Sequence, residues 1–230
     1  METFASNIPS TELISLNGSC TATFGNYSAM PKNGATGVFI KDMVVICGGI
    51  ARNDCHKLSK GKTRFEFYTN LQQNRSDARS TSVNGKMWIT GGKNEKDEIM
   101  KSTQFLMPQN LNTTLCVDLP EPVYNHVLLN LNETTSIIIG GRNTLYGYSN
   151  RTWYFNHISN TWTRGPTLLS PRYWHAAGVI KDKGNDKEHM VVVGGEIKGN
   201  KKVFVELLFN GGNNWTIGNK FILFTFFNLF

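Results

Sequence analysis

Cysteine is the residue type in this chain with the clearest chemical potential. Two of the four cysteines, Cys47 and Cys55, lie eight residues apart around a turn that begins with Gly48 and Gly49. On adjacent strands these two thiols could face each other and form a disulfide. Free buried thiols are the alternative. No CxxC pair occurs, and Cys20 and Cys116 stand alone, so the sequence predicts no zinc site.

Catalytic and nucleotide-binding patterns are absent from the sequence. It contains no GxSxG, HExxH, GxxxxGK[ST] or GxGxxG segment. Those segments hold a nucleophilic serine, a zinc ion or a phosphate group in the enzymes that use them. We therefore predict no catalytic residue, no cofactor-binding residue and no metal ligand.

Two polar segments are candidates for contact with a partner, because binding residues gather on loops. The first covers residues 49–63 and includes Arg52, Asn53, Asp54 and His56. The second covers residues 181–188 and includes Lys183 and Asp186. A solvated hairpin without a partner is the alternative for the second segment.

The charge and hydropathy patterns restrict the class of partner. The net charge is +7, from 24 Lys and Arg against 17 Asp and Glu, but the basic residues are scattered and form no stripe with interleaved aromatics. We therefore expect no nucleic-acid partner. The most apolar stretch, at residues 221–230, is too short to span a membrane. Residues 1–16 have neither the basic start nor the continuous apolar run of a signal peptide.

Four Gly-Gly pairs reveal an internal repeat. Each pair ends a short apolar strand, and the steps between the first glycines are 43, 49 and 54 residues. A repeat of this length with an all-strand pattern is typical of a propeller. Glycines at strand ends allow a positive φ and a close approach of backbone. The pairs are Gly48–Gly49, Gly91–Gly92, Gly140–Gly141 and Gly194–Gly195.

Further strands recur around each glycine pair. Apolar segments precede the pairs at 34–40, 78–83, 125–129 and 174–180, and alternating segments follow at 63–68, 102–106, 151–155 and 203–209. Trp162 follows Tyr154 by eight residues, and Trp215 holds the matching position in the last unit. Each unit therefore has the four short strands of one propeller blade. His126 and His175 occupy equivalent positions, which favours a packing role for both.

These residues resemble kelch repeats. The resemblance is carried by the glycine pairs, by Tyr154 ahead of Trp162, by the Gly165–Pro166 turn and by Arg172 followed by His175. It covers residues 10–217 and is weaker in the first two units, where no Trp follows Tyr68 or Phe105 at the expected distance. The resemblance implies an all-β fold, a kelch-type β-propeller.

The register of the repeat predicts an incomplete ring. We expect a partial blade over 1–20, kelch repeats over 21–70, 71–117, 118–165 and 166–218, and an apolar tail over 219–230. The chain thus starts inside a blade and has about four full ones, whereas the family forms closed rings, usually of more blades. We therefore expect a fragment, an open arc or an alternative product of a longer propeller.

The resemblance implies a non-enzymatic protein–protein interaction module that binds an unidentified protein partner through its blade loops. One alternative is the substrate-recognition part of a ubiquitin-ligase adaptor, although the helices that this family carries upstream are not found here. A galactose-oxidase-like enzyme is the other. That enzyme holds copper through Tyr and His ligands, and no residue of this sequence can be placed on its site.

Glycosylation sequons bear on the compartment. Seven Asn-x-Ser/Thr sequons occur, which is a mild excess over chance. Together with Cys47 and Cys55, they favour an extracellular or secreted parent over a cytoplasmic one. The sequons start at Asn17, Asn26, Asn74, Asn112, Asn132, Asn150 and Asn214.

Overall fold

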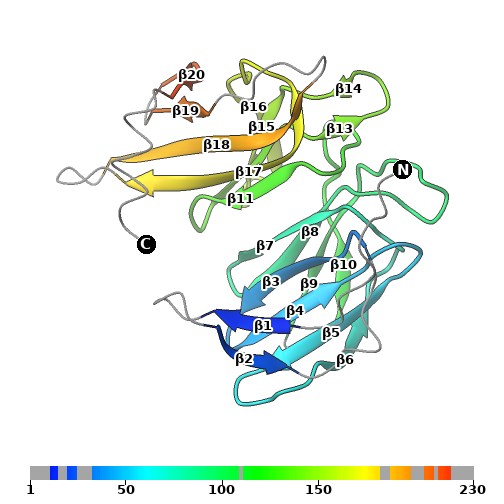
Figure 1. Cartoon of the computed structure of the whole chain (residues 1–230). Coiled ribbons are helices and arrows are strands. Elements are labelled where there is room, and N and C mark those ends of the chain that lie inside the picture. Colours follow the sequence, from blue (N-terminus) through cyan, green and yellow to red (C-terminus); the bar gives the residue numbers. More distant parts are fainter. Residues whose placement is uncertain are drawn as a thin grey trace, which may run out of the picture.

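The structure is a computed structural model. It describes residues 33–108, 111–181, 187–197, 205–209 and 212–218, together with the backbone of strands at 11–14 and 20–24. Every regular element in this part of the chain is a β-strand, paired antiparallel with its neighbours (Figure 1). The all-β prediction is therefore confirmed. Among the described residues, no helix is long and apolar enough to cross a membrane.

Four sheets of four strands follow one another along the chain. The first sheet contains β3 (Thr36–Ile40), β4 (Met43–Cys47), β5 (Asp54–Ser59) and β6 (Glu66–Asn70). The second contains β7 (Arg79–Val83), β8 (Lys86–Thr90), β9 (Thr103–Leu106) and β10 (Thr113–Leu115).

The third sheet contains β11 (Val127–Asn130), β12 (Thr135–Ile139), β15 (Thr152–Asn156) and β16 (Thr161–Arg164). The fourth contains β17 (Arg172–Lys181), β18 (Glu188–Ile197), β19 (Glu206–Leu208) and β20 (Thr216–Ile217). Two strand pairs stand apart: β1 (Thr11–Ile14) with β2 (Cys20–Phe24), and β13 (Arg142–Asn143) with β14 (Gly147–Tyr148).

Each sheet is a meander, so its two ends differ. At one end the first strand turns into the second and the third into the fourth; we call this the hairpin end. At the other end the second strand connects to the third, and the fourth leads to the next sheet; we call this the loop end. The four Gly-Gly pairs of the repeat lie at the loop end: the first three follow directly on the second strand of their sheet, and Gly194–Gly195 lies near the end of β18.

The sheets are joined through their first strands. Strands β3, β7, β11 and β17 lie next to one another in sequence order (Figure 1). At the loop end, left-handed residues link them: Asp77 N–H donates to Gly34 O at 2.7 Å, Asn125 N–H to Asp77 O at 3.0 Å, and Trp174 N–H to Asn125 O at 3.2 Å. One backbone position thus recurs in all four sheets and ties each sheet to the next.

The glycine pairs make a second set of links between sheets. The second glycine donates its N–H to the segment that leads into the next sheet: Gly49 to Arg75 O, Gly92 to Val123 O and Gly141 to Arg172 O, at 2.8–2.9 Å. A Cβ on Gly48 or Gly91 would clash with the same carbonyl of that segment. The glycines are therefore required for close packing between sheets as well as for their positive φ.

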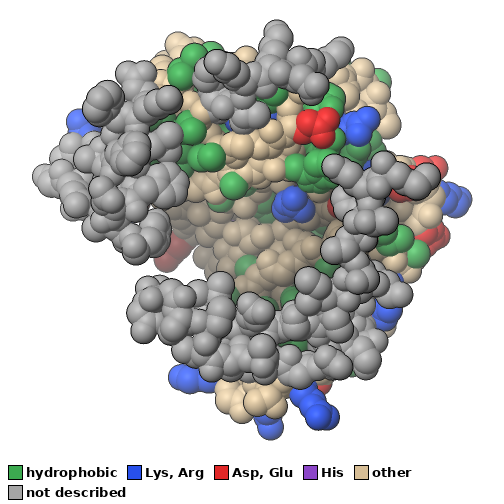
Figure 2. Space-filling view, viewed as in Figure 1, with side chains coloured by type: hydrophobic (Ala, Val, Ile, Leu, Met, Phe, Trp, Pro, Cys, Tyr) green, Lys and Arg blue, Asp and Glu red, His purple; other side chains and the backbone are tan. Residues whose placement is uncertain are grey.

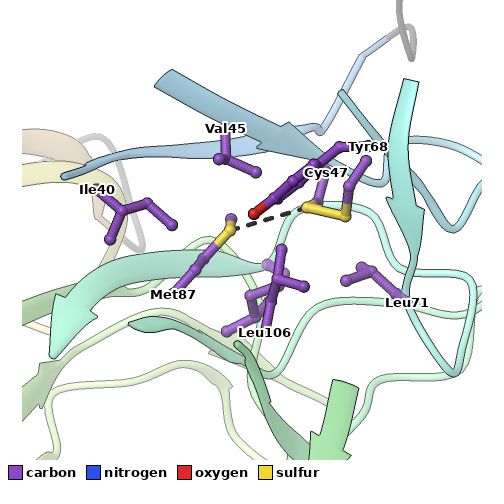
Figure 3. Packing of buried hydrophobic residues seen from close by; sticks show 10 residues of the cluster. Ile40, Val45, Cys47, Tyr68, Leu71, Met87 and Leu106 are labelled. Carbon is purple, nitrogen blue, oxygen red and sulfur yellow. Dashed lines mark hydrogen bonds between the residues drawn. A yellow bond between two sulfur atoms is a disulfide. The ribbon is translucent and has the colours of Figure 1, made fainter. Parts of the chain in front are cut away.

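Apolar clusters fill the space between successive sheets. The cluster between the first and second sheets includes Ile40, Val45, Met87 and Leu106 (Figure 3). Trp88 stacks on Phe155 between the second and third sheets, with ring centroids 5.0 Å apart. The third cluster joins the third and fourth sheets. Face-to-face packing of whole sheets thus forms the hydrophobic core.

The predicted disulfide pair lies within the first of these clusters. Cys47 and Cys55 face each other directly in the register of β4 and β5, and their sulfurs are bonded. The Met87 sulfur lies 3.8 Å from Cys47 Sγ (Figure 3). The disulfide therefore joins neighbouring strands in the dry interior of the first sheet.

The sequence interpretation of residues 49–63 as one loop is wrong beyond Asn53. Residues Asp54–Ser59 form β5, the third strand, and the segment predicted as third strand at 63–68 contributes to β6, the fourth. The polar residues that suggested a loop are satisfied inside the sheet, since Asp54 pairs with both Arg52 and His56. The polarity of this segment suggested a loop, but its polar side chains pair with one another, so the segment can form a strand.

Candidate functional site

The loop end of the third and fourth sheets gathers aromatic and charged side chains. Arg142 and Tyr148 come from the β13–β14 hairpin, which is inserted between the second and third strands of the third sheet. Tyr173 and Trp174 open β17, and Glu196 lies in β18 opposite Tyr173. We call these five residues the aromatic platform.

A carboxylate fixes the two tyrosines of the platform. Glu196 accepts hydrogen bonds from Tyr148 Oη at 2.5 Å and from Tyr173 Oη at 2.6 Å. The tyrosine rings meet edge to face, with centroids 4.9 Å apart. These two hydroxyl donors lower the pKa of Glu196, and burial together with the carboxylate raises the pKa of Tyr173. These contacts thus hold Tyr148 and Tyr173 in one arrangement.

Arg142 supplies the exposed positive charge of the platform. Its guanidinium lies 5.8 Å from the Tyr148 ring centroid and 5.7 Å from that of Tyr173. Within the described residues, no carboxylate forms a salt bridge with it. The backbone of Arg142 makes two hydrogen bonds with that of Tyr124: Arg142 N–H donates to Tyr124 O at 2.9 Å, and Tyr124 N–H donates to Arg142 O at 3.0 Å. A guanidinium held on aromatic rings but not neutralised can still pair with a partner.

Trp174 is the exposed anchor of the platform. Its side chain is 59% exposed, and its ring packs on Tyr173 with centroids 4.6 Å apart. Its backbone is left-handed, with φ of 54°, at the position where the preceding sheets have Asp77 and Asn125. Asp and Asn tolerate that conformation, whereas a bulky side chain rarely adopts it. A strained backbone that presents an exposed Trp is a feature found at functional sites.

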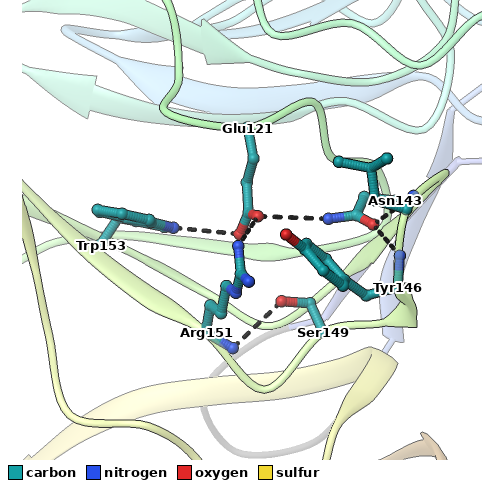
Figure 4. A network of polar contacts seen from close by, with 7 residues as sticks. Glu121, Asn143, Tyr146, Ser149, Arg151 and Trp153 are labelled. Atoms are coloured by element: carbon teal, nitrogen blue, oxygen red, sulfur yellow. Dashed lines mark hydrogen bonds and ion pairs between the residues drawn. The ribbon is translucent and has the colours of Figure 1, made fainter.

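A second polar network supports the hairpin beside the platform (Figure 4). Glu121 accepts hydrogen bonds from Arg151 Nη1 at 2.5 Å and from Trp153 Nε1 at 3.2 Å. Asn143 Oδ1 caps the turn by accepting from the backbone N–H of Leu145 and Tyr146. The Tyr146 ring lies over Arg151, 4.0 Å from its guanidinium carbon, and remains half exposed.

The glycines predicted as repeat positions divide into two groups. Gly48, Gly91 and Gly140 each abut the segment that leads into the following sheet, whereas a Cβ on Gly194 would meet no described atom within 4 Å. Their partners Gly49, Gly92, Gly141 and Gly195 also have positive φ values. The described contacts of these glycines are therefore structural.

Of the other predicted repeat positions, Arg172 and Trp215 are buried, and Tyr154 and Trp162 are partly buried. Trp162 packs against Trp88, with ring centroids 5.8 Å apart, and Trp215 donates from Nε1 to Pro166 O at 3.0 Å. Tyr154 packs against the third apolar cluster. Arg172 is fully buried and pairs with Glu206 at 2.5 Å.

The predicted partner residues of the first polar segment are committed to internal contacts. Arg52 forms a bidentate ion pair with Asp54, with donor–acceptor distances of 2.7 and 2.8 Å. This pairing lowers the pKa of Asp54 to about 2. Asn53 donates to Leu71 O, and His56 is buried. Lys183 and Asp186, from the second segment, lie outside the described residues.

The two equivalent histidines pack against glycines of the preceding sheet. His126 lies on Gly91 and His175 on Gly140. His126 Nε2 is 2.8 Å from Thr90 Oγ1. Burial lowers the pKa of both, that of His175 to about 3, so both are neutral near pH 7. In the described part of the chain, no three His, Cys, Asp or Glu side chains gather as a metal site would.

Sequence reasoning missed all five residues of the aromatic platform. One signal could have found Trp174. Aligning the repeats places it at the position of Asp77 and Asn125, where a bulky residue is out of pattern. Tyr148 and Glu196 carry no such signal, since only the fold brings a hairpin of one sheet beside a strand of the next.

Successive four-stranded meanders joined through their first strands are those of a β-propeller. A solved structure, that of YjhT, shares the fold: it superposes with a TM-score of 0.74 at 16% identity, over 89% of this chain and 75% of that one. The arrangement of the sheets thus has a counterpart in a known protein.

Sequence comparison reaches the same class of protein. Alpha-scruin of Limulus polyphemus is 28% identical over 151 residues, which is 58% of this chain and 16% of that protein. Beta-scruin of the same animal is 25% identical over 164 residues, or 64% of this chain and 18% of that protein. No protein-family profile matches the chain. The scruin similarity and the shared fold support the kelch-repeat family for this chain.

Proposed function

We propose that this chain is a non-enzymatic protein–protein interaction module, an arc of kelch blades that binds a protein partner at its loop end. Each four-stranded sheet is one blade, and the β1–β2 pair belongs to a partial one. The observation that carries the proposal is Trp174, an exposed aromatic side chain on a left-handed backbone position. Trp, Tyr and Arg dominate the energetic centres of protein interfaces.

The surroundings of Trp174 support the same proposal. Tyr173 and Tyr148 are fixed by Glu196, so ordering them costs little conformational entropy on binding. Arg142 offers an exposed charge next to the rings. On the face shown in Figure 2, the described Lys and Arg side chains are scattered singly or in small groups. The surface that we propose for the partner is the aromatic platform, with Arg142 as its exposed charge.

Affinity capture with matched variants tests the proposal. The full chain, Trp174→Ala and Ile158→Ala serve as baits, since Ile158 is also an exposed apolar residue but lies at the hairpin end. We expect Trp174→Ala to lose a partner that the other two baits retain, with binding weakened on the order of 10-fold or more. A partner lost equally from both variants, or from Ile158→Ala alone, would contradict a binding site at the loop end.

A further inference from the structure

The glycosylation sequons segregate between the two ends of the sheets. Five sequons start within the described residues. Those at Asn74 and Asn150 lie at the loop end, and those at Asn112, Asn132 and Asn214 lie in turns of the hairpin end. The first two are half-buried and the last three are exposed. Since only the sequons at the hairpin end are exposed, that end is the one suited to modification.

In the two loop-end sequons, the side-chain amide nitrogen of the asparagine already donates a hydrogen bond. Asn74 Nδ2 donates to Glu95 Oε2 at 2.5 Å. Asn150 Nδ2 points to Leu168 O at 3.4 Å, and Leu168 N–H donates back to Asn150 O at 2.8 Å. A sugar on either nitrogen would displace these contacts, and at Asn150 it would separate the segment before β15 from the segment that follows β16.

Asn132 has the opposite geometry. It lies in the turn between β11 and β12, where its Oδ1 accepts from both the N–H and the hydroxyl of Thr134 at 2.9 Å. This Asx turn closes the sequon on itself. Among the described residues, no hydrogen bond engages Asn132 Nδ2. Asn132 is exposed, and the hydroxyl of its sequon is fixed beside its side-chain amide.

Space for a sugar is present next to Asn132. A groove of about 500 Å³ opens beside it between the third and fourth sheets, and its lining includes Leu131, Tyr154, His189 and Phe209. The disulfide between Cys47 and Cys55 is of the kind that forms in an oxidising compartment, in which N-glycosylation also takes place.

We propose that Asn132 is an N-glycosylation site and that the hairpin end is the sugar-bearing end of the molecule. In the transfer, the amide nitrogen forms a bond to the anomeric carbon of an oligosaccharide carried on a lipid pyrophosphate. The bond from that carbon to the pyrophosphate oxygen breaks, the lipid pyrophosphate leaves with the electron pair, and the amide loses one proton. A glycan at this end leaves the aromatic platform at the other end uncovered.

Expression with a secretory leader in animal cells tests the site. Glycopeptide mass spectrometry of the full chain should find Asn132 occupied and Asn150 unoccupied. Asn132→Gln and Thr134→Ala should each remove one glycan, whereas Thr134→Ser, which keeps the sequon, should retain it. Asn150→Gln should leave the glycan content unchanged.

The result that overturns the proposal is an unmodified Asn132. If a variant is not secreted, the same peptides are analysed from the chain retained inside the secretory pathway, since transfer precedes export. An unmodified Asn132 in that pool overturns the proposal in the same way. Occupancy of Asn150 in folded, secreted protein would overturn the division between the two ends.

Discussion

The loop end and the hairpin end of the same sheets are held by different kinds of contact. At the loop end, backbone bonds between sheets recur at Asp77, Asn125 and Trp174, and glycine pairs pack against the next sheet. At the hairpin end, two-residue turns such as Asn84–Gly85 have positive φ at both residues, and the link from this turn to the next sheet is a side-chain one, from Asn84 Nδ2 to Glu133 O at 3.2 Å. A rigid scaffold of shared backbone bonds suits precise binding, whereas exposed surface turns tolerate a bulky modification.

The largest loss of stability should come from replacing Glu206, whose buried carboxylate positions the segment that leads into the platform. It accepts from Arg172, Leu169 N–H and Ser170 N–H at 2.5–3.0 Å. Glu206→Ala should lower the free energy of unfolding by about 3–5 kcal/mol, because the buried guanidinium of Arg172 loses the carboxylate that it pairs with. Gln104→Ala is the matched control in the second sheet. Denaturant titrations should show a smaller loss there, and an equal loss would contradict the role of Glu206.

The disulfide should have the next largest effect. Replacing Cys47 and Cys55 together with Ala opens a short loop between β4 and β5 and should cost about 2–3 kcal/mol of stability. Thiol titration of the unfolded, unreduced chain should find two of the four thiols protected. Four free thiols would refute the pairing and would weaken the assignment to an oxidising compartment.

Two glycines of the second sheet, one at each end, allow a direct comparison of the two ends. Gly91 and Gly85 both have positive φ, but a Cβ on Gly91 would clash with Val123 O, whereas one on Gly85 would meet only the end of the Lys41 side chain. Gly91→Ala should cost about 2–3 kcal/mol and Gly85→Ala about 1 kcal/mol. If the two variants unfold at the same midpoint temperature, the loop end is no more constrained than the hairpin end.

The smallest effect should appear as a pH dependence at the loop end. The pKa of His175 falls from 6.5 to about 3 on folding, so below pH 6.5 the unfolded chain takes up a proton that the folded chain excludes. Stability should therefore fall between pH 6.5 and 5, by about 1–2 kcal/mol from this residue. Asp54 contributes only at lower pH, because folding lowers the pKa of its carboxyl group from 3.8 to about 2.

The variant His175→Gln provides the check on this pH dependence. It should flatten the slope of unfolding free energy against pH over the same range. Part of the slope should remain, because burial also lowers the pKa of His126. An unchanged slope would mean that the imidazole of His175 is protonated in the folded chain.

The repeat was predictable from sequence because its signals are local. Gly-Gly at a strand end and alternating apolar residues mark the second and third strands of each later sheet, and the β15 and β9 regions were located to within a residue or two. The third strand of the first sheet was missed, because Asp54 and His56 look like loop residues until their pairing is known.

The platform was not predictable for a different reason. Tyr148, Tyr173 and Glu196 come from three strands of two sheets, and their contacts depend on how those sheets pack. Single-sequence patterns describe the period within a strand, and they carry no information on side chains brought together across sheets.

Hydrogen exchange of the chain with and without its captured partner shows which end of the sheets the partner covers. We expect slower exchange on binding in residues 141–151 and 172–175, which contain Arg142, Tyr148 and Trp174, and no change in the hairpin turns at 131–134 and 156–161. Slower exchange confined to those hairpin turns, with residues 141–151 and 172–175 unchanged, would contradict binding at the loop end.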